Sequence, residues 1–189
     1  MSKKKKRMIL GSGKSYIVEY TGEIPADDVI ETDDNLLGHT SGGATLSYTP
    51  TYYTAKDDHG LVEKTILTEE EAKLLLGVCT LNGTTIAKLV STARVVEDTD
   101  THRTIEIGGA GNDNGKNYII RFVHTDPVDS DIRITIIGKN EAGLSLAFAK
   151  DKETVVNPEF KAKPHGEKGT RIIYKETYKT TTAAATTTT

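Results

Sequence analysis

The sequence predicts a mainly β protein, a β-sandwich or β-barrel with one α-helix packed against it. Apolar and polar residues alternate with a period of two through many short segments, which is typical of strands with one buried face. Gly- and Asp-rich turns separate these segments, and only one stretch has clear helical spacing. At 189 residues the chain is long enough for one domain with a hydrophobic core.

The expected strands are short and bounded by turn residues. They are Ser15–Tyr20, 44–52, Leu61–Leu67, Arg103–Ile107, Tyr118–Val123, Ile132–Ile137, Leu144–Ala149, Thr154–Ala162 and Arg171–Tyr174. The sequence 126–129 has Pro at its second position, which favours a type I turn between the strands Tyr118–Val123 and Ile132–Ile137.

The second and third of these strands should form a long hairpin. Thr and Ser residues alternate with Ala44, Leu46, Tyr48 and Tyr52, and the turn-forming sequence 57–60 then leads into the partner strand. Pro50 cannot donate a ladder hydrogen bond, so we expect an edge strand or a bulge at this position.

One helix is expected after Asn82, a good N-cap residue. Apolar residues follow at helical spacing, at Ile86, Leu89, Val90 and Ala93. A second segment is ambiguous, because Thr68–Glu71 has the form of a capping box and predicts a helix through Leu76. The residues from Ala72 to Val78 also alternate like a strand, although local propensity alone favours the helix.

Charge is distributed unevenly along the chain, whose formal net charge is −3. Five of the 24 basic residues lie together without acids, at Lys3, Lys4, Lys5, Lys6 and Arg7. The remainder holds 19 basic and 27 acidic residues, a net charge of −8, which is not typical of a nucleic-acid binder. We therefore divide the chain into a basic N-terminal segment (1–9), a β domain (10–176) and a Thr/Ala tail (177–189) that we expect to be disordered.

Two glycine-rich stretches imitate phosphate-binding loops. Residues 11–15 lack the first glycine of a P-loop and precede a strand-like run instead of a helix. Residues 108–115 lack the glycine spacing of a dinucleotide loop and the Glu that completes a calcium loop. We interpret Asn114-Gly115 as a hairpin turn between two strands.

Side chains able to carry catalysis are scattered. The acidic clusters at 27–34, 97–100 and 126–131 lie in turn-like segments without a paired nucleophile, and the five histidines lack metal-ligand spacing. The single cysteine, Cys79, is interpreted as a core residue and excludes an internal disulfide, which fits folding in a reducing cytoplasm. The sequence therefore predicts no enzyme, no cofactor and no metal site.

Several stretches resemble tail tube (major tail) proteins of bacteriophages that infect Gram-positive hosts. These stretches are 42–50, the hairpin through 57–60 to 65–67, 68–72, Ile132–Ile137, 143–153 and 158–162. The resemblance is a pattern of strands and turns over roughly residues 10–176, without a catalytic motif.

The resemblance implies a β-sandwich that closes with its neighbours into a six-fold ring with a continuous inner β-barrel. Stacked rings would form a hollow tube in a virion tail assembled in the host cytoplasm. The tube would conduct DNA without binding it specifically, or puncture a membrane in a bacteriocin-like particle. Partners would be further copies of the chain and the tape-measure, tail-terminator and baseplate or initiator proteins, without membrane anchoring.

The resemblance also assigns positions. The hairpin loop over 50–64 would contact the adjacent ring, with candidate residues Tyr52, Tyr53, Lys56, Asp57, Asp58, His59 and Leu61. The basic residues 3–7 are further inter-ring candidates. Residues 70–78 would form a strand on the lumen side that includes Glu70, Glu71 and Lys73, and the lumen would be acidic.

Two other classes of function stay open. The first is a monomeric β-sandwich binding module, such as a carbohydrate- or host-surface adhesin, although the chain has no Trp for stacking on sugars. The second is a metal-dependent hydrolase that uses the acidic loops.

Overall fold

The structure is a computed structural model, and it describes residues 13–79, 83–126, 130–151 and 153–178. The fold is mainly β, as the sequence predicts. Its strands are β1 (Lys14–Glu19), β2 (Leu36–Lys56), β3 (Glu63–Val78), β4 (Ala93–Asp98), β5 (Arg103–Ile107), β6 (Tyr118–His124), β7 (Ser130–Asn140), β8 (Glu159–Ala162) and β9 (Ile172–Tyr178). The helical elements are α1 (Asp27–Ile30), α2 (Gly83–Leu89) and two 3₁₀ turns, Asp33–Asn35 and Ala110–Asn112.

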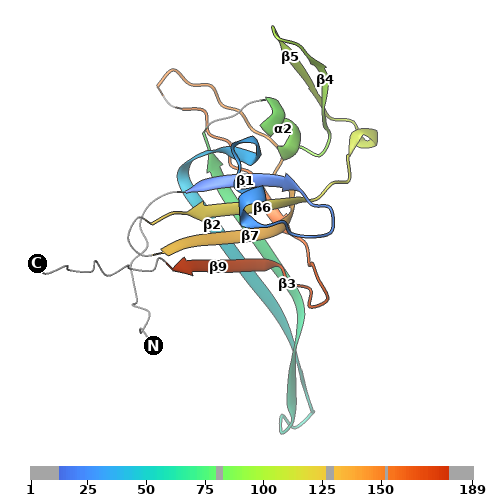
Figure 1. Cartoon of the computed structure of the whole chain (residues 1–189). Helices are drawn as coiled ribbons and strands as arrows, with labels where there is room; N and C mark the ends of the chain where they lie inside the picture. Colours follow the sequence, from blue (N-terminus) through green and yellow to red (C-terminus); the bar gives the residue numbers. More distant parts are fainter. Residues whose placement is uncertain (1–12, 80–82, 127–129, 152, 179–189) are drawn as a thin grey trace, which may run out of the picture.

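Six antiparallel strands close into a barrel. The order around it is β6-β1-β2-β3-β8-β7, and β7 returns to pair with β6. Figure 1 shows β1, β6, β7 and β9 as one layer, with the longer β2 and β3 crossing behind it. β8 pairs with the end of β7, at residues 138–140, and β9 pairs with β7 over residues 130–136. β9 therefore extends the front layer outside the closed ring.

The main core fills the space between the two layers. It contains the inward residues of β6, the inward residues of β3 and Phe160 of β8, all of them buried. Leu89 of α2 joins the same cluster and is 1% exposed. The expected hairpin between β6 and β7 is confirmed, with Ile120 opposite Ile136. The proline-containing turn predicted at 126–129 lies mostly outside the described residues.

The middle of the front layer is buried on both faces, because a second cluster covers its outer face. This cluster consists of Tyr16, Ile30, Ile119, Val123 and Ile137, with Ile24 and Leu36 packed around it. Every residue of β6 is consequently buried, which explains why Tyr118–Val123 reads as a nearly continuous apolar run.

The helix predicted from the capping box at Thr68–Glu71 is wrong, and the strand implied by the family resemblance is correct. β3 runs through the whole segment and pairs with β2 from Lys56–Glu63 to Thr40–Val78. The alternating residues Ala72, Leu74, Leu76 and Val78 are all 0% exposed. Burial of one complete face together with a long ladder outweighs the small differences in helix propensity.

The expectation for Pro50 is confirmed. β1 pairs with β2 only as far as His39, so β2 is an edge strand at Pro50. The ladder also shifts register next to this position, between Thr51 and Tyr52.

Two sequence predictions in the second half of the chain are wrong. Residues 144–149 form no strand, and Phe148 is 85% exposed, because β8 already occupies the adjacent edge of β7. Asn114-Gly115 is not a hairpin turn, since β5 pairs only with β4 and β6 pairs with β1 and β7. The strand predicted over 154–162 is reduced to β8 and one bridge between Val156 and Val78.

The predicted helix is confirmed as α2, which is seven residues long and ends at Leu89. Its proposed N-cap, Asn82, lies outside the described residues. Ala93, which the pattern placed on the helix, begins β4 instead. Cys79 is only partly buried at the end of β3, with its Sγ 3.2 Å from the carbonyl oxygen of His39.

Candidate assembly surface

The hairpin of β2 and β3 continues well beyond the barrel. β8 contacts β3 only at Lys73–Leu75, so the ribbon has no third strand beyond that point among the described residues. Every residue from 51 to 69 is exposed, and we call this segment the hairpin arm. Its paired portion, Thr51–Lys56 opposite Glu63–Glu69, projects about 20 Å at 3.3 Å per residue (Figure 1).

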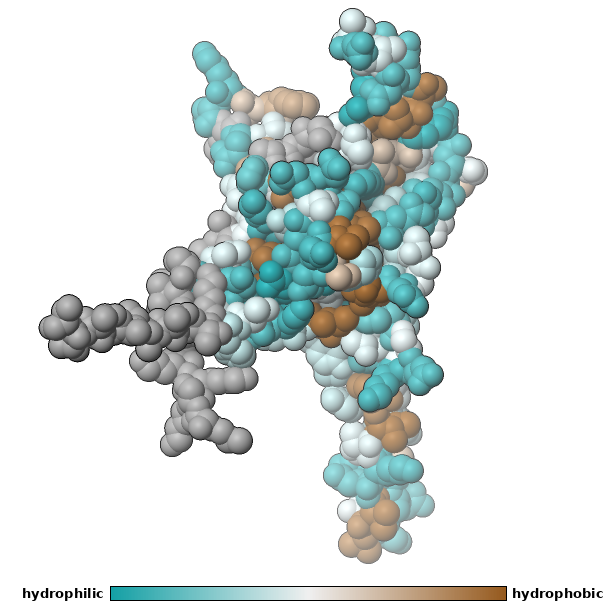
Figure 2. Space-filling view, viewed as in Figure 1, coloured by the Kyte–Doolittle hydropathy of each residue, from teal (hydrophilic) through white to brown (hydrophobic). Residues whose placement is uncertain are grey.

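The hairpin arm carries more apolar surface than a solvated loop. Its exposed large side chains are Tyr52, Tyr53, Leu61, Val62, Ile66 and Leu67, and Tyr48 lies just before it. Tyr52 is 61% exposed and Leu61 is 84% exposed. Figure 2 shows brown, hydrophobic patches along the ribbon that projects from the barrel. A two-stranded ribbon is marginally stable in water, and apolar surface of this kind typically marks an interaction site.

The apolar side chains lie on both faces of the hairpin arm. Tyr52 is paired with Leu67 on one face, and Tyr53 is paired with Ile66 on the other. Thr68 is the extra residue in the ladder, and its hydroxyl donates to the Thr51 carbonyl at 3.1 Å. The two Tyr–aliphatic pairs follow the bulge in regular register, and strand alternation places them on opposite faces.

The tip of the hairpin arm is a well-formed turn. The Val62 amide donates to the Asp57 carboxylate at 2.8 Å, and the Asp57 amide donates to the Val62 carbonyl at 3.0 Å. Gly60 has a φ of 68°, a left-handed conformation that favours glycine. The hydrogen bond from Val62 holds the pKa of Asp57 below its ordinary value. Lys56 and Glu63 pair across the ladder at 3.2 Å.

All seven candidate contact residues of the hairpin loop lie on the hairpin arm and are exposed. Sequence reasoning missed Val62, Ile66 and Leu67, which supply about half of its large apolar side chains. The signal was present, because Ile66 and Leu67 are adjacent apolar residues in a strand that should bury only one face. The basic candidates Lys3–Arg7 lie outside the described residues.

The three predicted lumen residues do not share a face. Glu71 and Lys73 point outward from β3, whereas Glu70 points to the opposite side. Glu70 accepts a hydrogen bond from the Tyr48 hydroxyl at 2.7 Å and lies 3.5 Å from Arg171. Because strand residues alternate between faces, only Glu71 and Lys73 of the three lie on the outward face of β3.

Glu71 and Lys73 belong to a charged surface across three strands. Lys73 lies 3.4 Å from Glu71 and 3.3 Å from Glu159, and Lys161 of β8 lies 3.3 Å from Glu71. A contact of 3.9 Å from Lys161 to Glu141 continues this row toward β7. The neighbouring carboxylate of Glu159, followed by that of Glu71, raises the pKa of Lys73. Acidic and basic groups alternate here, so the surface is mixed in charge.

The described residues do not form the metal site that was considered for the acidic loops. No group of three or more His, Cys, Asp or Glu side chains in this part of the chain is placed to hold a metal ion. Asp27 and Glu31 of the first acidic cluster pair with arginines instead. The described helices include none with the length and apolar character needed to cross a membrane.

No model of a protein family matches the chain, and no curated protein matches it.

Proposed function

We propose that this chain is the structural subunit of a phage tail tube, or of a related phage-tail-like particle. Copies of the chain would form six-fold rings, and the rings would stack into a hollow tube. The observation that carries the proposal is the hairpin arm, an exposed ribbon with large apolar side chains on both faces. Such a surface is a liability in a monomer and useful in a subunit that polymerises.

The position of the hairpin arm suits an interface between unlike surfaces. It projects from one end of the barrel, while the β4–β5 hairpin and α2 lie at the other end (Figure 1). A contact between unlike ends of identical subunits propagates head to tail and builds a filament when it does not close. The hairpin arm would reach the next ring in this way.

Two apolar faces require two partner surfaces. The Tyr52–Leu67 face and the Tyr53–Ile66 face cannot both be buried against a single flat neighbour. A hairpin arm inserted between two subunits of the adjacent ring would bury both. The free edges of β2 and β3 would also gain hydrogen-bond partners there.

The outward face of β3 and β8 is the candidate lumen wall. Its Lys73, Lys161 and Glu71 are paired with each other and with neighbouring charges. Paired charges on rigid strands present little unbalanced cationic surface to which phosphates would bind, so DNA would pass without adhering. The proposal assigns the chain no catalytic group and no cofactor, and its partners are the tape-measure, terminator and initiator proteins.

The carbohydrate-binding alternative receives less support. Sugar platforms need aromatic rings on a shared surface, whereas the adjacent Tyr52 and Tyr53 point to opposite faces of the ribbon.

The test is sedimentation velocity of the wild-type chain and of three double variants over a range of concentrations. Tyr52→Ser with Leu67→Ser removes one apolar face, and Tyr53→Ser with Ile66→Ser removes the other. Thr54→Ser with Thr65→Ser is the control, because this pair occupies the same ribbon and its hydroxyls are hydrogen-bonded at 2.9 Å.

We expect large assemblies from the wild type and the control, and only small species from either apolar variant. If both apolar variants assemble as well as the wild type, the hairpin arm is not the contact. The same samples mixed with tail-initiation proteins test whether assembly needs a nucleus.

A further inference from the structure

The segment between β1 and β2 is attached to the barrel differently from the rest of the chain. We call residues 21–35 the strap. Its backbone hydrogen bonds include Ile30 to Ala26 and Glu31 to Asp27 within it, and the Leu36 amide to the Asp33 carbonyl at its end. The nearest ladder contacts flank it, at Tyr20 with Asn117 and at Leu36 with Tyr16. The strap therefore has internal order but no strand pairing that holds it down.

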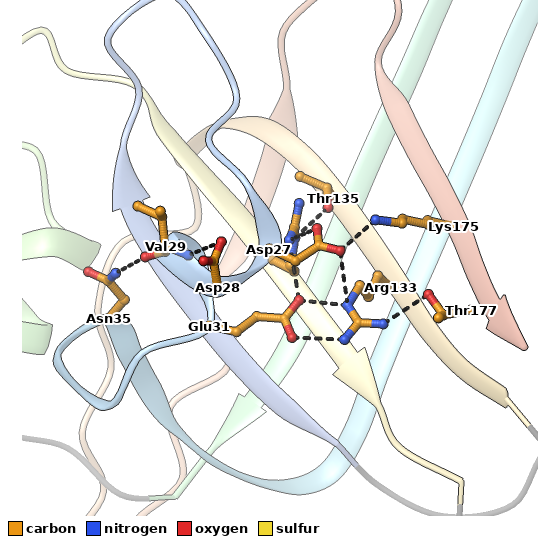
Figure 3. A network of polar contacts seen from close by, with 10 residues as sticks. Asp27, Asp28, Val29, Glu31, Asn35, Arg133, Thr135, Lys175 and Thr177 are labelled. Carbon is orange, nitrogen blue, oxygen red and sulfur yellow. Dashed lines mark hydrogen bonds and ion pairs between the residues drawn. The ribbon is translucent and has the colours of Figure 1, made fainter. Parts of the chain in front are cut away.

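Ion pairs hold the strap on the front layer (Figure 3). Arg121 of β6 donates to Asp27 at 2.7 Å and to Glu31 at 3.2 Å. Arg133 of β7 donates to both oxygens of Glu31, at 2.7 and 3.0 Å. Lys175 of β9 donates to the other oxygen of Asp27. Two carboxylates of the strap are thus bound by cations from three strands.

The arginines depend on these carboxylates. The Arg121 side chain is only 6% exposed and that of Arg133 is 14% exposed. Arg121 also donates to the Thr135 hydroxyl at 3.0 Å, and Arg133 donates to the Thr177 hydroxyl at 3.2 Å. A buried cation that loses its counter-ion is unstable unless water can solvate it. Lifting the strap would expose these arginines to water.

The strap covers a core that is separate from the main one. Ile30, at 0% exposure, packs on Tyr16, Ile119, Val123 and Ile137 on the outer side of the front layer. The main cluster lies on the inner side of the same strands. The barrel ladder and its inner core would therefore survive if the strap were lifted.

We propose that the strap is a lid held closed by ionised Asp27 and Glu31, which opens as a unit while the barrel stays folded. Opening uncovers the second apolar cluster and the cations of β6, β7 and β9. The lid involves no residue of the hairpin arm, so it does not depend on the proposed function.

Protonation of Asp27 sets the direction of the pH dependence. The hydrogen bond from Lys175, opposed by burial and aided by Arg121, holds the pKa of Asp27 below its ordinary value. The contribution of Asp27 to closure is therefore complete above about pH 4, the ordinary carboxyl pKa. It is lost as the pH falls through the lowered pKa of the folded state.

Other charged groups face the strap from each neighbouring element. Asp131 of β7 lies near Arg133, and the Tyr16 hydroxyl of β1 faces Glu31 and Asp33. Lys88 of α2 faces Asp34. Protonation of Asp27 would remove the charge that Arg121 and Lys175 bind, so it favours opening.

Hydrogen exchange of the full chain, followed by mass spectrometry at pH 7, tests the lid. In Glu31→Gln we expect residues 21–35 to exchange at least about tenfold faster, with 118–124 and 132–138 unchanged. Asp28→Asn is the matched control, since Asp28 lies on the same turn and accepts only from the neighbouring Val29 amide at 3.1 Å. Lys175→Met, a milder change at a half-exposed cation, should speed exchange of the strap by a smaller factor.

In the wild type, exchange of the strap, corrected for intrinsic exchange rates, should become faster as the pH falls through the lowered pKa of Asp27. Faster exchange in β6 and β7 to the same extent as in the strap would overturn the proposal, because the ion pairs would then stabilise the whole barrel. Unchanged exchange of the strap in both Glu31→Gln and Lys175→Met would also overturn it.

Discussion

Single residues determine how closely neighbouring backbone segments of the barrel can approach each other. Gly138 stands where β7 turns from β6 and β9 toward β8, and a Cβ there would lie 1.9 Å from the Lys161 carbonyl oxygen. A Cβ at Gly77 would likewise lie 1.9 Å from the Ser41 carbonyl oxygen. Both glycines are required by close backbone approach, and neither has a positive φ.

Gly138→Ala should destabilise the barrel, because the obstructing atoms belong to the β8 backbone and cannot move alone. We expect a loss of about 1–3 kcal/mol in the free energy of unfolding, measured by urea denaturation. Gly111→Ala is the control, since a Cβ at that position would meet no described atom within 4 Å. Equal stability of the two variants would mean that the β7–β8 contact is loose.

A second prediction at this scale concerns Asp57 at the tip of the hairpin arm. Its pKa is lowered by the Val62 amide, so its contribution to the turn is present above about pH 4 and is lost below the lowered pKa. Asp57→Ala should therefore speed exchange of the Val62 amide in NMR spectra at pH 7, and its effect should decline as the pH falls through the lowered pKa of Asp57. Asp58→Ala serves as the control, and equal effects of both variants would refute the role of Asp57.

At the scale of elements, each strand stabilises the fold mainly through the side chains of its buried face. Within β3, Leu74 is 0% exposed while its neighbour Leu75 is 39% exposed on the opposite face. Leu74→Ala should lower the free energy of unfolding by about 2–5 kcal/mol, and Leu75→Ala by less than about 1 kcal/mol. Thermal unfolding followed by circular dichroism compares the two, and similar losses would contradict the assigned register.

The sequence was informative where alternation and turn chemistry agreed. The β2–β3 hairpin, its turn after Lys56 and the edge character at Pro50 follow from local residues. The capping-box helix and the strand at 144–149 failed because strand formation depends on whether a partner edge is free, which local sequence does not encode.

The candidate surface was predicted only in part, for a similar reason. Turn residues and tyrosines located the hairpin arm, but which of Glu70, Glu71 and Lys73 face outward depends on the register of β3, which the local sequence does not fix. The strap network could not be foreseen either. Asp27 and Glu31 read as a solvated acidic loop, and their partners Arg121 and Arg133 lie about 90 to 100 residues away.

At the scale of the whole molecule, the barrel is a rigid base from which the hairpin arm projects. None of the side chains of residues 51–69 is buried in the single chain, so this segment contributes little to the core. Under our proposal, its apolar side chains become buried only when copies meet, and hydrophobic burial would supply the free energy of assembly.

An assembly of this kind should respond to salts in a characteristic way. Apolar contacts strengthen in sulfate and depend weakly on sodium chloride, whereas ionic contacts weaken as salt screens them. We expect light scattering of the concentrated protein to rise with ammonium sulfate and to stay nearly constant between about 0.05 and 0.5 M sodium chloride. A steep fall with sodium chloride would assign the interface to charges instead.

The most direct test of the central claim is negative-stain electron microscopy of the purified, concentrated chain beside its Tyr52→Ser/Leu67→Ser variant. We expect hollow rings or tubes of uniform diameter for the wild type and none for the variant. Small separate particles from the wild type at every concentration, even with tail-initiation proteins added, would contradict the assignment as a tube subunit.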